Sequence, residues 1–477
     1  MPDALFAVER AAQFVPERWA RFGWRSHLTL ACCTLLHAFT HALGTLLVPL
    51  YLLIVADLHL RGVRQASLVI TVYGFVYCIA SYLGGLLADR FDRRFLLSIG
   101  LAGNALAIIG FGLTRRYEVL VALGVLAGLF GTLFHPSANS LVPSHYPKNP
   151  GLAIGILGMG SGLGFFAGPQ FAGYRAEHAS WQLGSIANWQ RPCVEAGAIA
   201  LAASIVFLFL LRETRNRRVV DPDPDACDAM LPARVSVEAI VTEITGSPET
   251  CGRAMGKPLR RRVIAIASIL GFRDFAGVAS LTIVSLYLQK AHNYDAHRAG
   301  FVVGTMMLLS VLINPVSVWI SPGRRRLPAL AISLVAGGVV LALAPFTPVR
   351  FVLPVLAVFQ VCQLGSYSIS DAAMLERVDS AVRGRVVGLF LTLAGTFASI
   401  SPFAMGLWVD LLGERAKSAG GFIWPFAALG AMMIIAAFAT PLIAGLATQE
   451  MEPQMDADQR RGRESEINPR SSAPISG

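Results

Sequence analysis

Six ionisable side chains interrupt the long apolar runs of this sequence, and they are the residues best placed to do chemistry. They are His37, His41, His135, Arg273, Asp274 and Asp371. An Arg, Lys or Asp at the centre of a bilayer costs at least ~2.5 kcal/mol, so such a group usually faces a cavity or a partner. We therefore predict that these six residues bind a substrate and carry protons.

The spacing of these residues indicates a role for each. His37 and His41 are four residues apart and share a helix face, where they could form one proton-accepting patch. Arg273 and Asp274 are adjacent, about 100° apart around a helix, so we expect each to find its partner elsewhere. We hypothesise that Asp274 and His41 carry a coupling proton and that Arg273 binds an anionic or polar group of the substrate. The alternative is a static Arg273–Asp274 pair within the bundle, with histidines that satisfy backbone carbonyls.

The sequence around these residues is that of a membrane protein. Of its 477 residues, 54% are hydrophobic and 15% are charged, and the mean hydropathy is +0.57, whereas soluble domains contain about 25% charged residues. Helices of about 20 apolar residues span ~30 Å of hydrocarbon, and the runs lack the alternation of a transmembrane barrel. We predict an all-α membrane protein, embedded in a lipid bilayer, with twelve transmembrane helices at residues 27–55, 66–88, 95–114, 119–141, 151–174, 193–211, 263–288, 299–320, 328–346, 351–373, 386–409 and 422–447.

A long polar stretch between the sixth and seventh runs divides the chain. We expect residues 27–211 and 263–447 to form two six-helix bundles, joined by a cytoplasmic linker at residues 212–262. Residues 1–26 mix arginines with aromatic side chains, which is typical of an amphipathic helix at the cytoplasmic interface. Residues 448–477 lack apolar periodicity, and we expect a disordered cytoplasmic tail.

The two halves carry a weak internal repeat. Sliding the second half back by 233 residues superposes several glycines, for example Gly44 on Gly277, and it superposes His41 on Asp274. Duplicated halves are common in transporters. We therefore predict pseudo-symmetric bundles that hold ionisable groups at the same depth.

The charge distribution predicts the orientation in the membrane. The chain has 40 Lys and Arg and 30 Asp and Glu, a net charge of +10. Most of the basic residues fall on one side if both termini share that side, which places termini and linker in the cytoplasm. A membrane topology therefore explains the positive charge without nucleic acid. The seven cysteines form no CxxC and no Cys/His cluster, so we expect no metal site and no cofactor, and we expect a monomer.

The loop after the second predicted helix carries a recognisable pattern. It reads Gly85-Leu86-Leu87-Ala88-Asp89-Arg90-Phe91-Asp92-Arg93-Arg94 and resembles the GxxxDRxGRR signature of the Major Facilitator Superfamily at every position except Asp92. The resemblance implies a rocker-switch carrier whose cytoplasmic side is closed by contacts between the halves. A Gly here would let the helix end pack tightly. The implied gate residues are Gly85, Asp89, Arg90, Arg93 and Arg94.

The corresponding loop of the second half differs. It keeps Arg324, Arg325 and Arg326 but has Pro322 opposite Asp89. A second set of contacts between the halves, formed by this loop, would therefore lack its acid.

The fifth predicted helix contains Gly164, Gly168 and Pro169, which resemble the GxxxGPxxGG element of the superfamily's antiporters. Glycines four residues apart present a smooth face to a neighbouring helix. The alternative to a role in coupling is close helix packing alone.

Two short stretches resemble a branch of the superfamily. His37-Ala38-Phe39-Thr40-His41 and Phe134-His135-Pro136 are similar to fosmidomycin resistance proteins and their bacterial relatives. In that pattern an acid commonly follows the first His by four residues, and His41 stands in its place.

Together these features predict a secondary active transporter in the inner membrane of a bacterium. It would move a small organic solute by alternating access, driven by protons, and the resemblance favours export. The chain has no GxxxxGK[ST] loop for nucleotide phosphates, and it has neither a nucleophile and base pair nor a metal-ligand spacing, so we expect no enzyme. The alternative is a membrane sensor or assembly partner that keeps the carrier fold without transport.

Overall fold

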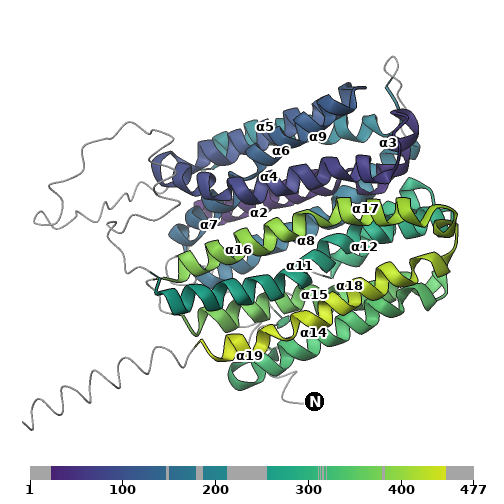
Figure 1. Cartoon of the computed structure of the whole chain (residues 1–477). Coiled ribbons are helices and arrows are strands. Elements are labelled where there is room, and N and C mark those ends of the chain that lie inside the picture. Colours follow the sequence, from purple (N-terminus) through teal and green to yellow (C-terminus); the bar gives the residue numbers. More distant parts are fainter. Residues whose placement is uncertain are drawn as a thin grey trace, which may run out of the picture.

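In the computed structural model of the protein, all regular elements of the described residues are helices (Figure 1). The structure describes residues 23–146, 150–178, 186–211, 255–309, 320–378 and 382–446, together with 311, 313, 316 and 317. Most of the predicted N-terminal segment, most of the linker and all of the predicted tail lie outside the described residues.

The described part of the first half forms six helical spans, drawn in purple to teal in Figure 1. They are α2 (Trp24–Thr45) with η1 (Val48–Leu50) and α3 (Tyr51–Asp57); α4 (Val63–Arg90); α5 (Arg93–Leu113); α6 (Tyr117–Gly131) with α7 (Phe134–His145); α8 (Pro150–His178); and α9 (Gln190–Leu210).

The second half repeats this order. Its spans are α11 (Lys257–Ala291); α12 (Ala296–Leu308); η3 (Gly323–Arg325) with α14 (Arg326–Leu343) and η4 (Ala344–Phe346); α15 (Val349–Leu375); α16 (Arg383–Ser399) with α17 (Ser401–Leu412), η5 (Gly413–Lys417) and η6 (Ala419–Phe422); and α18 (Ile423–Ala436) with α19 (Ala439–Ala444).

The packing confirms the predicted fold class. Ten helical segments of the described residues are long and apolar enough to cross a membrane, and α8 and α12, which adjoin residues outside the description, complete the twelve. In the first half α2 packs on α8 and α5 packs on α9; in the second, α11 packs on α16 and α14 packs on α18. These pairs are equivalent under the internal repeat, so the two bundles are pseudo-symmetric.

Prolines mark the places where spans are interrupted. Pro136 has no amide hydrogen to donate to the carbonyl of Thr132, four residues earlier, and the span is broken there into α6 and α7. Pro49 in η1 and Pro402 at the start of α17 lie at similar breaks.

Helix boundaries differ from the expectation by a few residues, most notably before the first and seventh spans. α2 already begins at Trp24, and α11 begins at Lys257, six residues before the predicted start of the span at residue 263. Pro258 in the first turn of α11 favours helix initiation, because its missing amide would have no partner there. Arg262 then donates a hydrogen bond to the carbonyl of Gly445, at the end of α19. The basic run at 260–262 is therefore part of the bundle.

The halves are held together at the end where α4 begins and α17 ends, which we call the closed end. The carboxylate of Asp410 in α17 accepts hydrogen bonds from the backbone amides of Val63 (2.7 Å) and Arg64 (3.0 Å), at the start of α4. About two helical turns deeper, the amide of Phe403 donates to Thr71 Oγ1 (2.9 Å). A carboxylate is favourable at a helix N-terminus, where amides lack partners.

Toward the opposite end, which carries the α4–α5 loop at residues 91–92, the halves separate. A Cβ added at Gly395 of α16 would still meet Cys78 of α4 at 3.0 Å. Further along the same helices, a Cβ at Gly85 or Gly388 would meet no atom within 4 Å. We call this the open end.

Within the first half, three glycines let α8 lie against α2. A Cβ at Gly160, Gly164 or Gly168 would come within 2.2 to 2.4 Å of a backbone carbonyl oxygen of α2. Small residues at such crossings allow backbones to approach, since hydrophobic burial gives little advantage between helices in lipid. Pro169 faces the other way, and its carbonyl lies against Gly300 of α12.

We predict that Gly164→Ala lowers the thermal unfolding midpoint in detergent, because its Cβ would lie 2.3 Å from the carbonyl oxygen of Ala38. Gly158→Ala is the matched control on the same helix, since a Cβ there meets nothing within 4 Å. The control should be neutral, or stabilising by up to about 1 kcal/mol from helix propensity. Equal midpoints for both variants would contradict the close contact.

We also predict that Asp410→Ala opens the closed end. Loss of a side chain that accepts hydrogen bonds from helix N-terminal amides typically costs ~1 kcal/mol. This corresponds to about a fivefold shift of the equilibrium toward the form in which the closed end has opened. Spin-label distances between Arg61→Cys and Arg415→Cys, both at exposed positions, in a background without native cysteines, measure the shift. Glu414→Ala, an exposed neighbour whose ion pair is with Lys417, is the control and should leave the distances unchanged.

Candidate functional site

A cavity of about 270 Å³ lies between the halves at the centre of the molecule. Its walls come from α2, η1, α4 and α8 on one side and from α11, α15, α16 and α17 on the other. The lining residues that bear on function are His41, Tyr73, Tyr77, Phe165, Asp274 and Tyr367. Of the six predicted site residues, only His41 and Asp274 line this cavity.

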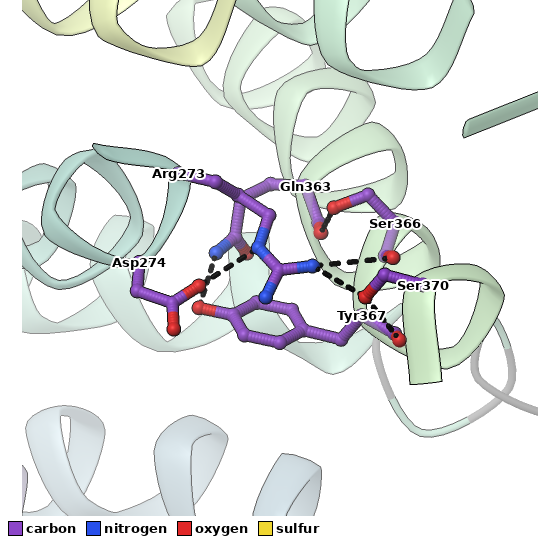
Figure 2. A network of polar contacts seen from close by, with 6 residues as sticks. All are labelled: Arg273, Asp274, Gln363, Ser366, Tyr367 and Ser370. Carbon is purple, nitrogen blue, oxygen red and sulfur yellow. Dashed lines mark hydrogen bonds and ion pairs between the residues drawn. The ribbon is translucent and has the colours of Figure 1, made fainter. Parts of the chain in front are cut away.

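Arg273 and Asp274 form an ion pair, contrary to the expectation that they would not pair. Arg273 Nε donates to Asp274 Oδ1 at 2.8 Å (Figure 2). The 100° between neighbours on a helix separates their Cβ atoms, but the long Arg side chain folds back across that angle. Arg273 is fully buried and Asp274 is 7% exposed. The geometry therefore agrees with the static alternative for this pair, with the carboxylate at the cavity wall.

Three residues of α15 complete the surroundings of Arg273 (Figure 2). Arg273 Nη1 donates to Ser370 Oγ at 2.8 Å and to the carbonyl of Ser366 at 3.3 Å. The guanidinium carbon lies 3.7 Å from the centre of the Tyr367 ring, a cation–π contact. These partners leave Arg273 on the far side of Asp274 from the cavity, so a role of Arg273 as a direct substrate ligand is not supported.

The residues on α15 carry a signal that the sequence contains. Gln363, Tyr367 and Ser370 follow a spacing of four and three residues, which places them on one helix face. Gln363 Nε2 donates to Tyr367 Oη at 3.2 Å and so holds the ring in place. This row of polar residues in an apolar span is visible in the sequence, but the sequence does not show that Arg273 contacts it. Asp371 is exposed on α15 and does not line the cavity.

The three histidines converge, which their positions in the sequence did not reveal. His37 Nδ1 lies 2.7 Å from the carbonyl of Leu157, and His37 Nε2 lies 3.1 Å from His41 Nε2. His135 joins them from α7, and one ring nitrogen of each residue lies within 4.8 Å of those of the other two. The break before Pro136 turns His135 toward α2. The alternative in which histidines satisfy backbone carbonyls therefore agrees with the contact of His37.

The predicted gate residues lie at the open end. Arg90 is exposed, and the side chain of Asp89 is outside the described residues. Asp92, the departure from the superfamily pattern, accepts from the Arg94 amide (2.9 Å) and pairs with Arg94 Nε (2.7 Å). Arg94 thus pairs with Asp92, the residue that caps its own helix, α5.

The close packing expected at Gly85 is found one residue earlier. A Cβ at Gly84 would lie 3.0 Å from the carbonyl oxygen of Thr132, whereas at Gly85 the surroundings are open. Because adjacent residues point about 100° apart on a helix, only one of the two faces α6 and α7.

Arg326, at the start of α14, pairs with an acid from another span of the same half. Arg326 is bonded to Glu376, just beyond the end of α15, and its Nε donates to the carbonyl of Ser321 at 3.2 Å. This pair does not join the two halves. The expectation that a second contact between the halves lacks its acid, because Pro322 stands opposite Asp89, therefore stays a prediction.

Comparisons with known proteins identify the family. The family model described as the Major Facilitator Superfamily matches residues 30–402 and residues 266–470. The chain belongs to this superfamily. The finer resemblance to fosmidomycin resistance proteins stays a prediction.

Similar curated proteins include resistance proteins of bacteria. The tetracenomycin C resistance and export protein of Streptomyces glaucescens is 31% identical over 38% of this chain and 34% of its own length. The multidrug resistance protein MdtG of Klebsiella pneumoniae (strain 342) is 30% identical over 40% of this chain and 45% of its own. The matched stretches thus span less than half of these relatives.

Solved structures share the fold over almost the whole chain. A bacterial homolog of the human lysosomal transporter Spinster has a TM-score of 0.67 at 16% identity, covering 87% of this chain and 96% of that one. The nucleoside transporter NupG has a TM-score of 0.63 at 13% identity, covering 87% and 99%. The family match and the apolar helices together identify a multi-pass membrane protein.

We predict that the Arg273 surroundings act as a unit. Asp274→Asn should destabilise by less than the ~3–5 kcal/mol expected for a buried charge that loses its partner, because Ser370 and Tyr367 still hold the guanidinium. Adding Tyr367→Leu should cost more than the two single changes together, by roughly 0.5–3 kcal/mol. Unfolding midpoints in detergent, measured for the wild type, both single variants and the double variant, complete this double-mutant cycle. The extra cost should vanish with Arg273→Gln in place, and additive costs in both backgrounds would contradict the prediction.

Proposed function

We propose that the protein is a secondary active transporter that exports a small organic solute in exchange for protons, by alternating access. The observation that carries this proposal is an ionisable carboxylate, Asp274, at the wall of a central cavity between two pseudo-symmetric halves. An intramembrane acid that faces such a cavity is by default a candidate for substrate or proton binding. This proposal describes a carrier rather than an enzyme.

The surroundings of Asp274 suit a residue that gains and loses a proton. When Asp274 is protonated, its charge no longer compensates Arg273, and burial of an unpaired cation is costly. Ser370, the carbonyl of Ser366 and the face of Tyr367 remain in contact with the guanidinium and reduce that cost. We therefore assign the coupling proton to Asp274 alone, since His41 Nε2 is already engaged with His37.

The cavity also indicates the kind of solute. Aromatic side chains from both halves, among them Tyr73, Phe165 and Tyr367, line it together with the one carboxylate. Such a wall fits a flat or apolar molecule that carries a hydrogen-bond donor or a positive charge. The export of tetracenomycin C and the drug resistance named for the relatives support export of compounds of this class.

In alternating access, the cavity would open to one side of the membrane and then to the other. The halves touch at the closed end through Asp410 and Phe403 and separate at the open end. The basic residues indicate that the termini and the linker lie on the cytoplasmic side of a bacterial inner membrane. In that orientation the open end faces the cytoplasm. A solute would enter there, and a proton on Asp274 would accompany the return.

We expect Asp274→Asn to abolish solute-dependent proton movement while solute binding is retained. Proteoliposomes with an internal pH dye and an imposed pH gradient measure proton flux on addition of tetracenomycin C, a quinolone and a wider solute panel. Glu118→Gln, an exposed acid in the first turn of α6, is the matched control and should keep full activity.

Three outcomes separate the alternatives. Proton flux that is unchanged in Asp274→Asn would sink the assignment of the proton to this residue. Solute flux without proton flux in the wild type would leave a carrier without proton coupling. Silence of the wild type across the panel would favour a membrane sensor or assembly partner, which would retain the fold.

A further inference from the structure

The cluster of His37, His41 and His135 is not needed for the proton assigned to Asp274. Its three imidazoles come from α2 and α7, and His41 lines the central cavity while His37 is buried behind it. One ring nitrogen from each lies within 4.8 Å of the others. Three imidazoles without an acid among them are an unusual set in an apolar interior.

The hydrogen bond of His37 fixes which of its nitrogens is available. The carbonyl of Leu157 can only accept, so His37 Nδ1, 2.7 Å away, carries the proton. His37 Nε2 is then left with a lone pair, directed at His41 Nε2 at 3.1 Å. A ring N–H that donates to a backbone carbonyl is the usual way in which proteins orient a metal-binding histidine.

We propose that His37, His41 and His135 bind one divalent transition-metal ion, of the class of Zn²⁺, Co²⁺ or Ni²⁺. This proposal replaces the expectation from the sequence that no metal site exists. Imidazole nitrogen suits these ions, whereas Mg²⁺ and Ca²⁺ prefer oxygen ligands, which this set lacks. Three histidines plus one open position form a common arrangement for zinc.

The distances allow such an ion with small movements. Zn–N bonds of about 2.0–2.1 Å in a tetrahedral site place two ligand nitrogens ~3.3 Å apart. The observed 3.1 Å between His37 Nε2 and His41 Nε2 is close to this value. One ring nitrogen of each of the three residues lies within 4.8 Å of the others, so the longest of these separations would have to close by up to ~1.5 Å.

Neighbouring elements hold the rings in place. Phe134 stacks on His37 with ring centres 4.8 Å apart, and Phe165 lies 4.4 Å from the ring of His41. The close crossing of α8 limits both histidines, since a Cβ at Gly160 would meet His37 Cβ at 2.8 Å and one at Gly164 would meet His41 Cβ at 2.9 Å. Preorganised ligands lose less entropy when an ion binds.

The open coordination position would be reached from the cavity, because His41 lines it. Tyr77 lines the same cavity and lies edge-on to His135, with ring centres 6.0 Å apart. Its hydroxyl is buried and has no hydrogen-bond partner in the part of the chain that the structure describes. A water molecule on the ion would offer this hydroxyl a partner.

The experiment uses the full-length protein, purified in detergent with its affinity tag removed and treated with a chelator. The protein is equilibrated with Zn²⁺, and bound metal is measured by mass spectrometry after removal of free ions. We expect one equivalent of Zn²⁺, and we expect Co²⁺ to give the visible absorption of a four-coordinate nitrogen site. Transport plays no part in these readouts, so they stand or fall separately from the proposed function.

Variants identify the ligands. His41→Ala and His135→Ala should each weaken Zn²⁺ binding by roughly tenfold or more, in monodisperse protein. The double variant His178→Ala/His297→Ala is the control, because these two rings pair near the closed end, where α8 ends and α12 begins, away from the cluster. Absence of stoichiometric Zn²⁺ in the wild type would overturn the proposal. So would binding that survives replacement of all three histidines.

Discussion

A cation inside an apolar slab must be compensated by its neighbours, and the second half of the protein is organised around one such cation. Arg273 is fully buried, and its partners are Asp274 on its own helix and Ser366, Tyr367 and Ser370 on α15. Because three of these partners lie on α15, they hold α11 and α15 in register and rotation. The carboxylate that remains at the cavity wall is therefore a consequence of how the Arg is buried.

The first half meets the same requirement differently. It places imidazoles beside the cavity, and α8 approaches α2 closely through Gly160, Gly164 and Gly168. The tight crossing leaves little freedom to the histidines of α2, which then meet His135. Pseudo-symmetric halves thus present different chemistry to one cavity, an acid from one side and ring nitrogens from the other.

The sequence was sufficient for the spans and their order, because bilayer thickness sets the length of each apolar run. It was insufficient where a contact depends on side-chain reach or on the direction of a broken helix. The Arg273–Asp274 pair was missed because residue spacing describes Cβ directions and not the reach of a long side chain. His135 was recognised as ionisable, but its meeting with His37 depends on the turn before Pro136. Glu376 was missed as the acid for Arg326 because it comes from a different span.

The named contacts at the closed end are all hydrogen bonds, whose strength depends on how well their atoms are aligned. Asp410 with the first amides of α4, and Thr71 with Phe403, are hydrogen bonds of 2.7 to 3.0 Å, and such bonds weaken steeply with misalignment. They share two neighbouring helices, so a tilt of α17 by an ångström or so would strain every one of them simultaneously. These contacts would then be lost together rather than one after another, and partly opened states of the closed end would be brief.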